Sequence, residues 1–86
     1  MAPQNQLNEI VNFLGTIGDD SSVPKSLKMR IQETIGVLKT EDEITLKINR
    51  AISELEDIGN DTNITPYIRT QVYNLISSLE GMLSLV

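Results

Sequence analysis

The chain of 86 residues contains no cysteine and no histidine, and each absence removes a class of chemistry. Without cysteine there are no disulfides and no thiolate metal sites. Without histidine, the commonest general base and the commonest metal ligand are missing. Glycine-rich phosphate loops, nucleophile elbows and zinc patterns are absent as well. We therefore expect a protein that is not an enzyme and that uses no cofactor.

Aromatic and basic residues are scarce, which limits both the core and the partners. Phe13, Tyr67 and Tyr73 are the only aromatic residues, so the core has to be aliphatic. Twelve acidic residues against seven basic ones leave a net charge of -5, and a field of that sign repels phosphate backbones. Nucleic-acid binding is therefore disfavoured. An RNA- or ribosome-associated role stays as an alternative that would use the local basic cluster of Lys25, Lys28, Arg30 and Arg69.

Long apolar runs are also missing. No stretch approaches the ~20 consecutive apolar residues that a membrane-spanning helix needs. The opening segment, MAPQNQ, has neither the basic residues nor the apolar stretch of a signal peptide. We therefore expect a cytoplasmic protein without a membrane partner, and the length predicts a single domain over 1–86.

The sequence contains one unit written twice. The segment IGDDSSVP at 17–24 returns as IGNDTNITP at 58–66, a spacing of about 41 residues counted from Ile17 to Ile58. The same spacing pairs Leu14 with Leu55, Leu27 with Ile68, Lys28 with Arg69, Ile31 with Val72, Ile35 with Ile76 and Leu38 with Leu79. A repeat of this length predicts two copies of one helix–loop–helix unit.

Apolar residues recur at helical intervals within each unit. The first set is Leu7, Ile10, Val11, Leu14 and Ile17. The spacing predicts helices over about 4–17, 24–39, 41–58 and 66–85. Thr65 followed by Pro66 is a favourable start for the last of them.

Three further expectations concern helix ends and outer faces. Gly18 and Gly59 are predicted to end the first and third helices in the left-handed conformation that glycine adopts without a Cβ clash. Thr40 and Glu43 fit a capping box at the start of the third helix. Lys47 is expected on the charged outer face of that helix, paired with Glu43 four residues before it.

Four one-sided helices joined by short loops predict an all-α fold. We expect an antiparallel four-helix bundle made of two repeated αα-hairpins, over about 4–39 and about 41–85. The first and third loops then lie at the same end. They carry the candidates for a divalent-cation site, which are Asp19, Asp20, Asn60 and Asp61. Their spacing is not that of an EF-hand loop, and the alternative is that they only satisfy helix ends and turns.

More apolar residues are present than four narrow stripes require, which favours a contact with another protein chain. The candidates for the contact are Phe13, Tyr73, Met82 and Leu83, together with the turn formed by Arg69, Thr70 and Gln71. The alternative is that some of these residues only flank the core. The predicted function is that of a small interaction module whose partner is another protein or a second copy of the chain, as in a homodimer.

Five segments carry a resemblance to a known family. They are DSSVP at 20–24, AIS at 51–53, IGNDTNI at 58–64, RTQVY at 69–73 and SLE at 78–80. They resemble a small archaeal family of uncharacterised proteins, number 0147 of the UPF series, which tends to have proline where Thr62 and Thr65 stand. The resemblance implies a cytoplasmic, archaeal, all-helical bundle, with a mirror-handed, bromodomain-like arrangement as one option. It implies no activity, cofactor or catalytic residue.

Overall fold

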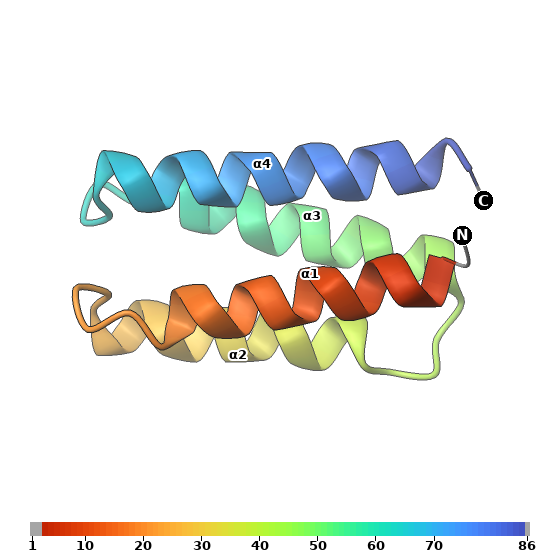
Figure 1. Cartoon of the computed structure of the whole chain (residues 1–86), viewed down its shortest axis with the longest axis horizontal. Helices are drawn as coiled ribbons and strands as arrows, with labels where there is room; N and C mark the ends of the chain where they lie inside the picture. Colours follow the sequence, from red (N-terminus) through yellow and green to blue (C-terminus); the bar gives the residue numbers. More distant parts are fainter. Residues whose placement is uncertain (1–2, 86) are drawn as a thin grey trace.

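The computed structural model describes residues 3–85 and consists of four helices joined by short loops. The helices are α1 (Pro3–Gly18), α2 (Lys25–Leu38), α3 (Ile44–Gly59) and α4 (Pro66–Leu83). They run in alternating directions, with the α1–α2 and α3–α4 loops at one end of the molecule and both termini at the other (Figure 1). The predicted antiparallel four-helix bundle of two αα-hairpins is confirmed.

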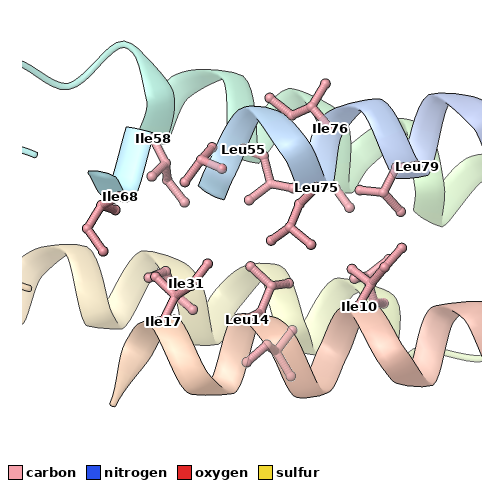
Figure 2. Close-up of a cluster of buried hydrophobic side chains, with 14 of the residues drawn as sticks. Ile10, Leu14, Ile17, Ile31, Leu55, Ile58, Ile68, Leu75, Ile76 and Leu79 are labelled. Carbon is pink, nitrogen blue, oxygen red and sulfur yellow. The ribbon is translucent and has the colours of Figure 1, made fainter. Parts of the chain in front are cut away.

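The interior is aliphatic, as the lack of aromatic residues predicts. Leu14, Ile48, Leu55 and Leu79 are among the most deeply buried side chains, and all three aromatic residues remain substantially exposed. Figure 2 shows core side chains of α1 and α2 facing those of α3 and α4 across the middle of the bundle. Each buried aliphatic side chain contributes about 1.5–3 kcal/mol relative to exposure, so this shared interior holds the two hairpins together.

The two hairpins begin their second helices differently. Thr65 caps α4 as predicted, because its Oγ1 accepts a hydrogen bond from the backbone N–H of Ile68 at 3.2 Å. In the first hairpin, α2 begins at Lys25 and not at Pro24. Pro24 is itself the N-cap residue, in an extended conformation, and it provides no side-chain cap.

The capping box predicted at Thr40 is wrong. Helix α3 begins at Ile44, and Glu43 is its N-cap residue without a side-chain hydrogen bond to the backbone. Thr40 belongs to the end of α2 instead, where its Oγ1 donates to the carbonyl of Val37 at 2.9 Å. The C-terminal carbonyls of α2 lack partners within the helix and compete successfully for this hydroxyl.

Lys47 does not lie on the outer face of α3. Only 8% of the residue is exposed, and its Nζ donates to the backbone carbonyl of Thr40 at 3.1 Å. The lysine therefore closes the end of α2 against the start of α3. The sequence prediction placed it outside because a charged side chain is rarely buried without such a partner.

The glycines at the helix ends have a different role from the one predicted. Within residues 3–85 no glycine has a positive φ, so Gly18 and Gly59 end their helices in the right-handed conformation. Both are buried, and Gly59 has the tighter surroundings of the two. A Cβ at Gly59 would lie 3.1 Å from Cζ of Tyr73, and a Cβ at Gly18 would lie 3.4 Å from Cγ2 of Ile31.

The four helices do not close the bundle evenly. Each helix packs closely on the next one along the chain, whereas α1 and α4 contact each other far less than the other neighbouring pairs. We call the contact region between two neighbouring helices a seam. The α1–α4 seam is the loose one, and it faces the viewer in Figure 1.

Candidate interaction face

The loop end of the bundle is built from the repeated segment, and its basic side chains bind its own backbone. Lys28 reaches back over the α1–α2 loop, where its Nζ donates to the carbonyls of Gly18 at 2.7 Å and Asp20 at 3.0 Å. Arg69, its counterpart in the repeat, donates from Nη2 to the carbonyl of Asp61 at 3.1 Å. The two cations therefore stabilise the two loops in the same way.

The loop carboxylates are also used within the loops. Oδ1 of Asp20 accepts from the backbone N–H and the hydroxyl of Ser22, both at 2.8 Å. The hydrogen bond from the backbone N–H of Ser22 lowers the pKa of the Asp20 carboxyl most. The bond from the Ser22 hydroxyl and the positive charge of Lys28 also lower this pKa below its ordinary value. Oδ1 of Asp61 accepts from the backbone N–H of Asn63 at 2.8 Å in the same type of turn.

The candidate cation ligands thus lie together at the loop end of the bundle, but several of them contact protein groups there. Oδ2 of Asp61 lies 3.9 Å from Nη1 of Arg30, an ion pair between α2 and the α3–α4 loop. Oδ1 of Asn60 accepts from the hydroxyl of Tyr73 at 3.4 Å, and Asp19 is exposed. Across residues 3–85 no group of three or more acidic side chains is arranged to hold a metal ion.

The predicted contact residues separate into different environments. Tyr73 lies against Gly59 and Arg69 binds the α3–α4 loop, so both lie on the side of α4 that faces α3. Thr70 is exposed, with its hydroxyl donating to the carbonyl of Pro66 at 3.0 Å. Met82 is only 3% exposed and belongs to the core, which corrects its expected place on an open surface. Leu83 is partly buried and packs against that core.

The feature that the sequence prediction missed is a groove between α1 and α4, near the chain termini. It has a volume of about 350 Å³ and is lined by Gln6, Glu9, Ile10, Ser78, Gly81, Met82 and Leu85. Ile10 and Met82 are core residues, so the groove reaches the apolar interior, while its rim is polar. It lies where the α1–α4 seam is loose.

The groove continues as one face toward the loop end. On α1, Phe13 follows Glu9 by one helical turn and lies on the same side of the helix. On α4, residues at helical intervals extend the stripe from Ser78 back through Asn74 and Gln71 to Tyr67. We call this surface the α1–α4 face and define it by Gln6, Glu9, Phe13, Tyr67, Gln71, Asn74, Ser78, Gly81 and Leu85, around the floor of Ile10 and Met82.

Charge is distributed unevenly between this face and the rest of the surface. Glu9 is the only charged residue of the α1–α4 face. The helices α2 and α3 carry most of the charged side chains within the helices. The scarcity of charge in 3–18 and 66–83 is visible in the sequence, and charged residues are also depleted at the cores of protein interfaces.

Comparison with known proteins places the chain in a family. A sequence model of the family described as "Uncharacterised protein family (UPF0147)" matches residues 1–82. The chain belongs to the UPF0147 family. A UPF0147 protein of Archaeoglobus fulgidus is 39% identical over 74 residues, which cover 86% of this chain and 85% of that protein. A UPF0147 protein of Thermoplasma volcanium is 32% identical over 80 residues, which cover 92% and 90%.

A third relative, the UPF0147 protein of Methanocaldococcus jannaschii, is 30% identical over 79 residues, which cover 91% of this chain and 85% of that protein. All three source organisms are archaea, and the resemblance found in the sequence is confirmed. No solved structure matches the chain. In residues 3–85 no helix is long and apolar enough to cross a membrane.

Proposed function

We propose that this UPF0147 chain is a non-enzymatic protein-interaction module of the cytoplasm and that it binds through the α1–α4 face. The observation that carries the proposal is the loose α1–α4 seam with its groove of about 350 Å³. Grooves between helices of a bundle receive side chains or helices of a partner, and an apolar floor with a polar rim is typical of such sites.

The composition of the face supports a protein partner. Phe13, Tyr67 and Leu85 are large apolar or aromatic residues that are 43%, 66% and 71% exposed. Aromatic residues are enriched in the cores of protein interfaces and charged residues are depleted there. A face with three such side chains and one charge fits that pattern, and it offers no positive potential to a nucleic acid.

The basic residues considered for RNA binding are engaged elsewhere. Lys28 and Arg69 donate to loop carbonyls, and Arg30 lies within ion-pair distance of Asp61. Only Lys25 of that cluster is fully on the surface. Among residues 3–85, the loop carboxylates considered for a cation also have partners within the protein, so protein contact is the role that we propose.

The test uses two arginine substitutions at exposed positions. Ser78→Arg places a long charged side chain across the groove, whereas Met29→Arg places the same side chain on the outer surface of α2. Each tagged variant and the wild type are recovered from the cells that make the protein, and the co-purifying chain is identified and quantified by mass spectrometry. Circular dichroism is used to check that both variants melt like the wild type.

We expect Ser78→Arg to reduce the co-purifying chain at least about tenfold, which corresponds to about 1.4 kcal/mol of binding free energy. Met29→Arg should recover it in wild-type amount. Equal recovery with Ser78→Arg, or a loss confined to Met29→Arg, would place the binding surface elsewhere and contradict the proposal.

A further inference from the structure

The sequence repeat relates the open seam of the bundle to a closed one, and the two seams differ in the side chains that line them. The repeat maps α1 onto α3 and α2 onto α4, so the α1–α4 seam corresponds to the closed α2–α3 seam. At a spacing of 41 residues, Gln6 corresponds to Lys47 and Gly81 to Thr40. In the closed seam this pair is joined by the hydrogen bond from Lys47 to the Thr40 carbonyl, whereas Gln6 and Gly81 line the groove.

The α1–α4 face has two unlike halves. The half near the termini contains the groove, and the half near the loops carries the exposed rings of Phe13 and Tyr67. A two-fold axis that lies in the plane of the face, perpendicular to the helices, exchanges the two ends. It therefore places the aromatic half of each copy over the groove of the other copy, so the same contact forms twice in the dimer.

The polar side chains of the face can form hydrogen bonds with the same side chains of a second copy. Gln6, Gln71, Asn74 and Ser78 carry amides and a hydroxyl, each of which both donates and accepts hydrogen bonds. A charged surface repels a second copy of itself, and two copies of this chain each carry a net charge of -5. The α1–α4 face carries one charged side chain, so the repulsion between two copies docked through it comes mainly from the two Glu9 carboxylates.

The face is long enough for a contact along both helices. From Tyr67 to Gly81 it extends roughly 21 Å along α4, at 1.5 Å per residue, in a bundle whose longest dimension is 34 Å between Cα atoms. A standard interface takes about 800 Å² from each partner, so the dimer requires α1 as well as α4.

We propose that the occupant of the groove is a second copy of this chain, docked face to face and end for end, with Phe13 and Tyr67 of each copy over the groove of the other. The inference rests on the proposed function and names its partner. In this dimer the middle of α4 lies at the two-fold axis, so Asn74 meets Asn74 of the other copy.

The absence of cysteine makes disulfide trapping a clean test. Asn74→Cys introduces a single thiol at the expected axis, and Glu33→Cys introduces one at the equivalent position of α2, since both residues are exposed. Both variants are oxidised mildly at several protein concentrations, and the wild type is followed by sedimentation velocity from about 10 μM to about 1 mM. Glu9→Gln and Ser78→Arg are measured alongside.

The dimer predicts that Asn74→Cys cross-links at least about tenfold faster than Glu33→Cys. It predicts a concentration-dependent wild-type dimer that Ser78→Arg abolishes. It also predicts that Glu9→Gln tightens the dimer several-fold, because the two Glu9 side chains lie near each other close to the axis and no longer repel. A partner with basic residues would bind Glu9→Gln more weakly.

Two outcomes would overturn the inference. A wild type that stays monomeric to about 1 mM with equal cross-linking of the two thiols excludes the second copy. If Ser78→Arg then still loses a different co-purifying chain, the proposed function stands with another partner. A dimer that forms but survives Ser78→Arg and is trapped by Glu33→Cys contradicts both the inference and the proposed face.

Discussion

Lys28 and Arg69 show how the repeat operates at the level of single residues. Each side chain folds back over the loop that precedes its own helix and donates to carbonyls that have no partner in regular secondary structure. The sequence predicted that the two positions correspond. It did not predict their role, because the carbonyls they bind are placed only when the helical hairpins form.

The contribution of this contact is measurable at Lys28. Lys28→Met keeps most of the apolar stem but removes the two hydrogen bonds to Gly18 and Asp20. Hydrogen bonds from a charged group contribute about 1.5–3 kcal/mol, reduced here by solvent, so we expect the free energy of unfolding to fall by about 1–2 kcal/mol. Urea denaturation is the measurement, and Lys25→Met is the exposed control, for which little change is expected. Equal effects of the two substitutions would contradict the assigned role.

The Asp20 carboxylate makes the stability of the first loop depend on pH. Its pKa in the folded protein lies below the ordinary value of 3.8, mainly because the backbone N–H of Ser22 donates to it. The unfolded chain, with the ordinary pKa, then binds more protons between the two values. The stabilising contribution is therefore complete above the ordinary pKa and is lost as the pH falls through the lower, folded value.

This dependence is tested with Asp20→Asn, which removes the titrating group. The difference in unfolding free energy between wild type and variant should be constant from about pH 7 to about pH 5 and should change below about pH 4, with the wild type losing stability relative to the variant. Urea titrations over this range provide the comparison. A difference that stays constant down to about pH 2.5 would show that the pKa of Asp20 is the same in the folded and unfolded states.

At the scale of helices, the apolar periodicity predicted all four elements to within one or two residues at each end, except that α3 begins at Ile44 and not at about 41. The spacing of apolar residues is visible in the sequence, so it predicts where a helix lies. Where the helix ends depends on which side chains bond to its unpaired backbone groups, and Thr40 bonds to the end of α2 and not to the start of α3. The position of Lys47 was wrong for a related reason. Its partner, the carbonyl of Thr40, is placed within its reach only because α2 ends just before that residue.

Gly59 tests the packing of α3 against α4. A Cβ at this position would lie 3.1 Å from Cζ and 3.2 Å from Oη of Tyr73, whereas nothing lies within 4 Å of a Cβ at Gly36 on α2. Gly36→Ala should raise the free energy of unfolding by about 0.5–1 kcal/mol through helix propensity. Gly59→Ala should stabilise less or destabilise, because the ring of Tyr73 has to move.

A double-mutant cycle isolates this contact. In a Tyr73→Ala background the ring is absent, so Gly59→Ala should become as stabilising as Gly36→Ala is in the wild type. Thermal or urea unfolding of the four proteins gives the interaction energy. If Gly59→Ala has the same effect with and without the ring, the close contact is not what selects glycine there.

At the scale of the whole molecule, the repeat predicted the two hairpins and the common end of their loops. The openness of the α1–α4 seam was not predictable from it, since the same repeat makes the closed α2–α3 seam. The difference arises from side chains that depart from the repeat. Val37 packs against the core in one seam, and its counterpart Ser78 lines the groove in the other.

The candidate site was predicted only in part for the same reason. Phe13 and Gln71 lie on the α1–α4 face as part of the predicted contact set, and Met82 forms its floor. Arg69 and Tyr73 were chosen because they stand out in the sequence, yet their contacts are with the α3–α4 loop and α3. Apolar spacing identifies side chains that leave the core stripe but does not show which of them a neighbouring helix covers.

Hydroxyl-radical footprinting tests most directly whether the α1–α4 face is a binding surface. The chain carries reactive side chains on that face at Phe13 and Tyr67, and a matched internal control away from it at Met29, which is 61% exposed. The dilute purified protein is compared with the same protein in concentrated lysate of the cells that make it. Because a lysate consumes radicals, labelling of Phe13 and Tyr67 is measured relative to Met29 in the same sample, and we predict that this ratio falls several-fold in the lysate. Unchanged labelling of both rings, or protection of Met29 instead, would contradict the assignment of this face.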